Sequence, residues 1–176
     1  MNINLMAPIN QLGYGVAGLN ILKSLQKQCE VSLFPIGQPQ VTNQADPDAV
    51  TKGIEASKLF DSQAPCIKIW HQNQMAERIG SGKFIGFPIF ELDTFSDIET
   101  HHLDACNELF VCSEWAKDVV ISNLYRLYKR LNLTKNVHVV PLGVDTEIFK
   151  PVNPHKKKKP YFLTAESGKS ARGTIF

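Results

Sequence analysis

The sequence lacks several features that would place it in a particular class of protein. No window of about 18 residues is apolar and uncharged throughout, so we expect no membrane-spanning helix. The start of the chain, MNINLMAPINQLGYG, has neither a charged region nor a long apolar stretch, which argues against a signal peptide. The four cysteines form no C-x-x-C pair, and no histidine lies at zinc-ligand spacing from two of them. We therefore expect reduced thiols, no bound metal and a cytoplasmic protein.

The composition excludes global disorder, since 43% of the 176 residues are hydrophobic and 20% are charged. This length is enough for one domain with a sizeable core and too short for two full domains. The net charge of +2 conceals a division along the chain. Residues 1–149 hold 12 basic and 16 acidic side chains, whereas residues 150–176 hold seven basic and one acidic. An acidic body with a basic tail is the more accurate description.

Short apolar strands alternate with amphipathic helices along residues 1–149. Strands that lack polar alternation and are separated by helices indicate a parallel sheet buried on both faces. Ser96 and Glu99 have the spacing of a capping box, and Ser113 can cap the longest helix. The predicted strands are Asn2–Ala7, Val31–Ile36, Cys66–Trp70, Phe84–Phe90, Leu109–Cys112 and Val137–Val140, and the predicted helices are Val16–Gln28, Ala49–Phe60, Asn73–Ile79, Asp97–Asn107 and Ser113–Leu131.

The predicted fold class is α/β, with a doubly wound, mostly parallel, Rossmann-like sheet over residues 1–149. Residues 150–160 hold three prolines and five lysines and are expected to form an exposed linker. Tyr161–Thr164 is predicted to be one new strand, so residues 161–176 would form the beginning of a second domain. Lys156–Lys159 lacks interleaved aromatic residues, which favours a solvated linker over a nucleic-acid-binding patch.

Three side chains follow strands at the edge where such sheets bind ligands. His71 comes directly after a predicted strand and is either a base, a donor to a sugar hydroxyl, or a structural residue. Glu91 and Asp93 follow the next strand and are suited to catalysis or hydroxyl recognition. The alternative for both acids is a loop charge near the start of the following helix.

Gly13, Gly15 and Gly18 form a G-x-G-x-x-G pattern that follows the first strand and enters the first helix. Glycines let backbone N–H groups approach an anionic or sugar ligand at a helix N-terminus. The pattern begins too late after the strand for the usual dinucleotide turn, and Gln38 occupies the position where an acid would hold a ribose. A ligand loop of another kind and a purely structural turn both remain open, and nicotinamide binding is the least favoured.

Four segments together resemble the N-terminal half of GT-B-fold glycosyltransferases of the family 4, group 1 type. They are NLMAPINQLGYGVAG, FPIFELDTF, NELFVCSEWAKDVV and VHVVPLGVDTEIFKP. The resemblance covers residues 2–151 and implies two Rossmann-like domains facing each other across a cleft. The N-terminal domain of this family mainly recognises the acceptor, and the C-terminal domain binds a nucleotide-sugar such as a UDP- or GDP-sugar. Transfer usually proceeds with retention and without a metal.

The resemblance also implies roles for particular residues. Gly13, Tyr14 and Gly15 match the glycine loop that lies across the cleft from the donor phosphates, and they would bind substrate. Glu91 falls where many relatives place a catalytic-loop residue, often histidine, and Asp93 is the second candidate. Lys169 and Arg172 echo a basic segment that holds the donor phosphates, although the spacing here is two residues shorter and one lysine is missing.

The sequence thus leads to three hypotheses about function. The first is a glycosyltransferase acceptor domain whose donor domain is supplied elsewhere, so that the chain by itself shows little or no transfer. The second is a sugar- or protein-binding module without catalysis, with an interdomain face that invites self-association. The third is a nucleotide-cofactor-binding Rossmann domain.

Overall fold

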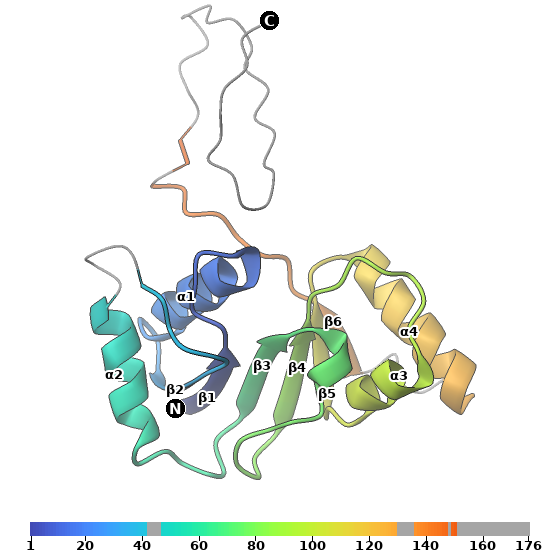
Figure 1. Ribbon diagram of the computed structural model, residues 1–176, viewed down its shortest axis with the longest axis horizontal. Coiled ribbons are helices and arrows are strands. Elements are labelled where there is room, and N and C mark those ends of the chain that lie inside the picture. The colour runs from blue at the N-terminus through green and yellow to red at the C-terminus, as the bar shows by residue number, and fades with distance from the viewer. Residues whose placement is uncertain (42–46, 130–135, 148, 151–176) are drawn as a thin grey trace, which may run out of the picture. The chain divides into compact units, whose positions relative to one another are not determined.

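The computed structural model describes residues 1–41, 47–129, 136–147 and 149–150. Within them the chain forms one six-stranded sheet, and every strand pairing is parallel. Figure 1 shows the sheet with its helices. The elements in chain order are β1 (Asn2–Ala7), α1 (Gly13–Leu25), β2 (Glu30–Pro35), α2 (Pro47–Ser57), β3 (Cys66–Trp70), the 3-10 turn η1 (Gln72–Gln74), β4 (Phe84–Pro88), α3 (Asp97–Asp104), β5 (Glu108–Val111), α4 (Glu114–Tyr128) and β6 (Val137–Val139).

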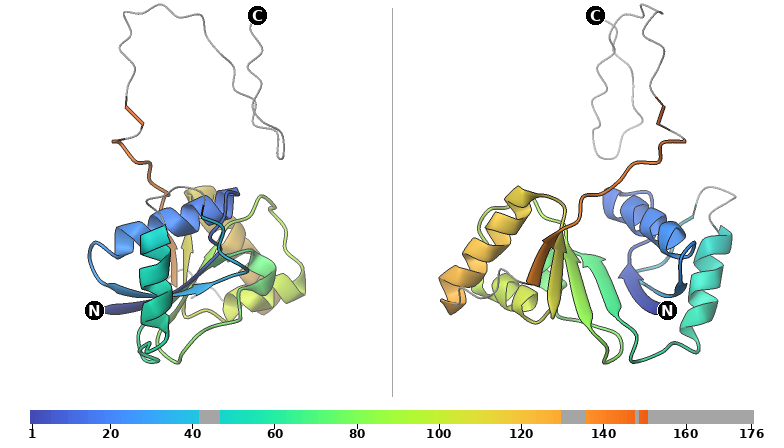
Figure 2. Two further views of the ribbon diagram at one scale, coloured as in Figure 1. Left: turned by 60° about the vertical axis from the view of Figure 1, so that its left-hand side comes forward. Right: turned by 180° about the vertical axis from the view of Figure 1, so that it is seen from behind.

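The strands lie in the order β2-β1-β3-β4-β5-β6, which confirms the predicted doubly wound, Rossmann-like α/β class. Two hydrophobic clusters pack on opposite faces of this sheet. One contains Leu5 and Leu33 of the sheet with Leu22 of α1 and Val50 of α2. The other joins Leu109 and Val111 of β5 to α3 and α4, which lie side by side in Figure 2. Both faces are therefore buried, as continuous apolar strands require.

Helices α3 and α4 begin where their capping residues predict. The Ser96 side chain accepts a hydrogen bond from the Glu99 backbone N–H, and Glu99 accepts one from the Ser96 backbone N–H. These bonds to the carboxylate hold the pKa of Glu99 below its usual value. Ser113 caps α4 by accepting from the backbone N–H of Ala116. Local hydrogen bonding thus determines both helix starts.

The segment between β3 and β4 differs from its prediction. Only η1 forms where a helix over Asn73–Ile79 is expected. Buried Lys68 of β3 donates from Nζ to the carbonyl oxygen of Gln74 (2.6 Å) and lies 3.3 Å from Oε2 of Glu77. The Arg78 guanidinium donates to the carbonyl oxygens of Gly80 and Gly82. The segment is held by these contacts instead of by helical hydrogen bonds.

The described helices include none that is long and apolar enough to cross a membrane.

The chain divides into two compact units, Met1–Leu142 and Gly143–Phe176. Most of the second unit lies outside the described residues, including the predicted linker at 151–160 and the predicted strand Tyr161–Thr164. The domain boundary at residue 149 therefore stays a prediction.

Candidate functional site

The strand order places a ligand-binding position at one edge of the sheet. The chain leaves β1 towards β2 on one side, and β3 lies on the other side of β1. Loops from the carboxyl ends of β1 and β3 therefore run in opposite directions, and open α/β sheets bind ligands where this reversal occurs. The N-terminal turn of α1 and the residues that follow β3 and β4 lie at this edge. Tyr14, His71 and Glu91 belong to these three segments.

Tyr14 connects the three segments. Its hydroxyl donates to the carbonyl oxygen of Ile89, just beyond β4, at 2.8 Å. The same oxygen lies 3.0 Å from Nδ1 of His71, just beyond β3. Tyr14 and His71 are both partly buried, and 57 residues separate them in the sequence. The first turn of α1 is thereby joined to the ends of two strands.

Aromatic rings surround this hydrogen bond. The Tyr14 ring centroid lies 4.5 Å from that of His71 and 6.0 Å from that of Trp70. The Trp70 indole N–H donates to Oε1 of Gln74 at 2.8 Å, and this bond restricts the orientation of the indole ring. Because buried Lys68 donates to the backbone carbonyl of Gln74, the lysine and the Trp70 indole are anchored to the same residue. Aromatic faces of this kind pack against apolar C–H groups while their polar edges stay hydrated.

Glu91 provides negative charge beside the cluster. Burial raises the pKa of Tyr14, and the carboxylate of Glu91 raises it further. Both effects disfavour the phenolate, so the hydroxyl stays protonated and remains a hydrogen-bond donor at neutral pH. Glu91 itself is exposed, which leaves its carboxylate free to contact a ligand. The structure thus joins Tyr14 and His71 by a hydrogen bond, with the Glu91 carboxylate near enough for its charge to act on the phenol.

Asp93 is held by a different set of contacts. Buried Asn123 of α4 donates to the carbonyl oxygen of Asp93 at 3.0 Å and accepts from the Phe95 backbone N–H at 2.9 Å. The Asp93 carboxylate accepts from the Thr94 hydroxyl at 3.2 Å. Asp93 therefore takes no part in the hydrogen bonds that join Tyr14 to His71, and its catalytic role stays a prediction.

Replacing Asn123 with alanine is expected to loosen the loop that carries Glu91 and Asp93. The change leaves the Phe95 N–H without its partner, which costs about 2 kcal/mol of unfolding free energy. Chemical denaturation and amide hydrogen exchange of residues 91–96 measure the two effects. Asn20→Ala is the control, because the exposed Asn20 amide bonds only within α1, to Val16. Unchanged exchange at 91–96 in Asn123→Ala would contradict this assignment.

All three glycines lie within α1, so Gly13 and Gly15 belong to the helix and not, as the expected start at Val16 implied, to a segment before it. The helix begins at Gly13 and not at Val16, so the G-x-G-x-x-G pattern occupies its first two turns. A Cβ atom at Gly15 would overlap Asn10, and one at Gly18 would overlap the carbonyl of Pro8. A Cβ at Gly13 would meet nothing within 4 Å. Two of the three glycines are therefore required for packing, and Gly13 alone faces open space.

The first turn of α1 has no side-chain cap. Leu12 occupies the N-cap position, and the turn contains no acidic residue. Its backbone N–H groups are thus available to an oxygen of a ligand, at the positive end of the helix dipole. Gly13, Tyr14 and Gly15 all lie in this turn, so the backbone can contribute donors next to the Tyr14 hydroxyl.

The sequence indicated part of this site and missed part. His71 and Glu91 were expected from their positions after strands; the structure places His71 in contact with Tyr14, and the charge of Glu91 acts on the Tyr14 hydroxyl. Trp70 and the Ile89 carbonyl were missed, although a tryptophan at the last position of a strand was a usable signal for Trp70. Lys169 and Arg172 lie outside the described residues, so their contact with donor phosphates stays a prediction. Among the described residues no cluster of His, Cys, Asp or Glu could hold a metal ion.

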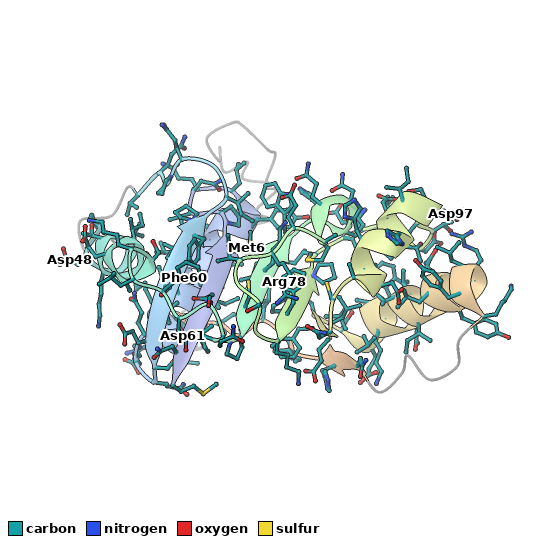
Figure 3. The ribbon with its side chains drawn as sticks, turned by 90° about the horizontal axis from the view of Figure 1, so that it is seen from below. Met6, Asp48, Phe60, Asp61, Arg78 and Asp97 are labelled. Carbon is teal, nitrogen blue, oxygen red and sulfur yellow. The ribbon has the colours of Figure 1, made fainter. Side chains whose placement is uncertain are left out.

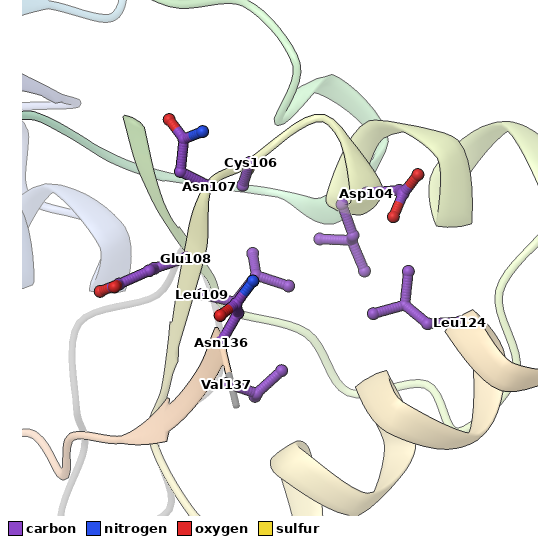
Figure 4. A pocket seen from close by; sticks show the side chains of 9 residues that line it. Asp104, Cys106, Asn107, Glu108, Leu109, Leu124, Asn136 and Val137 are labelled. Atoms are coloured by element: carbon purple, nitrogen blue, oxygen red, sulfur yellow. The ribbon is translucent and has the colours of Figure 1, made fainter. Parts of the chain in front are cut away.

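A hollow of about 280 Å³ lies at the opposite edge, where β5 and β6 begin. Asp104, Glu108 and Asn136 line its polar part, and Leu124 contributes to its apolar wall (Figure 4). The amino ends of the strands face the viewer's side in Figure 3, where Asp61 and Arg78 are labelled on the segments that precede β3 and β4. We assign the functional site to the Tyr14 edge, where the chemistry is concentrated.

Comparison with known proteins adds no further constraint on this assignment. The chain matches no family model, no curated protein and no solved structure. The identification of the site therefore rests on the sheet order and on the contacts of Tyr14 and His71.

Proposed function

We propose that this chain is the acceptor-side domain of a retaining, nucleotide-sugar-dependent glycosyltransferase. The observation that carries the proposal is the bond network of Tyr14, His71 and the Ile89 carbonyl at the switch point of a doubly wound sheet. The sequence segments that resemble family 4 glycosyltransferases lead to the same edge of the sheet. The proposal needs no metal, and a nucleotide-sugar is a substrate in it and not a cofactor.

The site suits recognition of a sugar acceptor. Trp70 and Tyr14 offer ring surfaces for the C–H face of a sugar, and His71 and Glu91 offer groups that bind its hydroxyls. The exposed carboxylate of Glu91 disfavours an anionic ligand at this position and favours a neutral or cationic one. A sugar with free hydroxyls satisfies all of these groups.

The donor would be bound largely by a second domain. In the proposal, Lys169 and Arg172 contact the diphosphate, whose developing negative charge must be stabilised as the sugar leaves. We expect sugar transfer only when a nucleotide-sugar-binding domain completes the enzyme.

Saccharide binding tests the proposal directly. Saturation-transfer NMR of the 176-residue chain is measured with p-nitrophenyl glycosides of glucose, galactose, mannose and N-acetylglucosamine. At least one is expected to bind, and His71→Ala is expected to weaken it about tenfold or more, because a ligand hydrogen bond is lost. His101→Ala is the matched control, since it removes another Tyr–His contact, the 2.9 Å pair with Tyr128.

Several outcomes are informative. Equal weakening by both histidine variants, or no binding of any glycoside, would contradict the assigned site. Release of UDP or GDP from nucleotide-sugars, measured with the bound glycoside present, then separates an enzyme from a binding module. Robust transfer by the chain alone would show that it needs no partner domain. Binding without transfer, even after a donor domain is supplied, would favour the binding module.

A further inference from the structure

The two hydrogen bonds of the Tyr14 hydroxyl determine which ring nitrogen of His71 carries a proton. A phenol has one proton, and the Ile89 carbonyl can only accept, so that proton is used in the 2.8 Å bond. The 3.0 Å contact between Tyr14 and Nδ1 of His71 therefore needs its proton from the histidine. His71 is thus an Nδ1–H imidazole, and in the neutral ring Nε2 carries a bare lone pair.

We propose that Tyr14 is a positioning residue that holds His71 in the Nδ1–H tautomer, so that Nε2 accepts a hydrogen bond from a hydroxyl of the acceptor sugar. Within the described part of the chain, no side chain or backbone group hydrogen-bonds to Nε2. His71 is only partly buried, which leaves room for a ligand there. This inference rests on the proposed function for the identity of the ligand, whereas the tautomer follows from the contacts of the free chain.

The surroundings keep this arrangement in place. Tyr14 lies on the first turn of α1, so its position is set by a helix that is packed closely against residues 7–10 through Gly15 and Gly18. Ring packing with Trp70 and Tyr14 restricts rotation of the His71 imidazole. The raised pKa of Tyr14 ensures that the phenol retains the proton it donates to Ile89. A hydroxyl that donates to Nε2 then meets an acceptor of fixed direction, which lowers the entropy cost of binding.

The tautomer is measured without any ligand. A long-range ¹H–¹⁵N spectrum of the unliganded chain, recorded at about pH 8 so that histidine is neutral, reports which ring nitrogen carries the proton. The His71 signals are assigned by their absence in His71→Asn. We expect a protonated Nδ1 and a bare Nε2 in the wild type, and a shift of population towards Nε2–H in Tyr14→Phe. An Nε2–H wild type, or a tautomer unchanged in Tyr14→Phe, would overturn the positioning role.

The role of Nε2 is measured with two substitutions at position 71. The amide nitrogen of His71→Asn occupies roughly the place of Nδ1 and preserves a donor to Tyr14, but nothing replaces Nε2. The amide of His71→Gln reaches roughly the place of Nε2. With the p-nitrophenyl glycoside that binds the wild type, we expect about tenfold weaker binding to His71→Asn and partial recovery in His71→Gln.

These results separate the inference from the proposed function. Wild-type affinity in His71→Asn, with its fold intact by circular dichroism, would overturn the role of Nε2. Failure of every glycoside to bind would contradict the proposed function and with it the sugar ligand, while the ligand-free spectrum would still decide the tautomer. The His71 signals can be assigned from either position-71 variant, His71→Asn or His71→Gln, so the tautomer stays testable if one of them fails to fold.

Discussion

Replacing Phe84 with alanine is expected to lower the free energy of unfolding by about 3–5 kcal/mol. Phe84 is the first residue of β4 and is fully buried. Its backbone N–H donates to Oδ1 of Asn107 at 2.7 Å, and the Arg78 guanidinium lies 5.5 Å from its ring centroid. The substitution removes apolar contacts and leaves a cavity that these anchored neighbours cannot fill. Since domains are stable by only about 5–15 kcal/mol, the loss is a large part of the total.

Urea denaturation, followed by circular dichroism, measures this effect. The matched control is Phe149→Ala, because Phe149 is 69% exposed and should change stability by no more than about 0.5 kcal/mol. A loss below about 1 kcal/mol in Phe84→Ala would show that the amino end of β4 is not packed as described. Equal losses in the two variants would lead to the same conclusion.

Gly18→Ala is expected to destabilise the fold by about 3 kcal/mol, since the added methyl group cannot be accommodated. Its Cβ would overlap the carbonyl oxygen of Pro8 and lie 3.0 Å from Cβ of Ala7. The Pro8 carbonyl oxygen is a backbone atom and cannot rotate away as a side chain can. Removing the overlap therefore requires that α1 move away from β1. The movement would open the cluster in which Leu22 of α1 packs against Leu5 and Leu33.

Gly13→Ala is the control within the same motif. Its Cβ would face open space, and alanine suits the first turn of a helix, so stability should stay within about 0.5 kcal/mol. Thermal unfolding of both variants at one pH gives the comparison. Equal stability of the two variants would show that Gly18 is not needed for packing. We expect a loss of stability at Gly18 and none at Gly13, which would show that the glycines of the pattern do not share one role.

Much of the fold could be predicted because its signals are local. The bounds of β1 and β3 agree with the predicted strands, since each is a short, mostly apolar segment that stops at a clear signal, Pro8 after β1 and the polar run from His71 after β3. The capping box of Ser96 and Glu99 predicted the start of α3. In each case the residues that determine the element lie within or next to it.

The differences arise where side-chain or backbone contacts between an element and the segment beside it decide the local structure. The helix expected over Asn73–Ile79 is reduced to η1 because Lys68, from the neighbouring strand, binds the carbonyl of Gln74. The early start of α1 depends on close packing of Gly15 and Gly18 against residues 7–10. Neither contact has a periodicity that a sequence pattern could reveal.

The candidate site follows the same division. The rule that ligands bind beyond the carboxyl ends of strands was enough to select His71 and Glu91. The bond between Tyr14 and His71 joins residues 57 positions apart and depends on side-chain directions, which the sequence does not encode locally. For this reason the sequence could name the members of the site, whereas their hydrogen bonds required the structure.

The strand order also has a consequence for how the chain assembles as it leaves the ribosome. Strand β2 adds to one side of β1 and β3 to the other, after which β4, β5 and β6 each add to the strand made immediately before. No strand has to insert between two that are already paired. The order of synthesis and the order of assembly can therefore coincide, so that each new strand finds its partner in place.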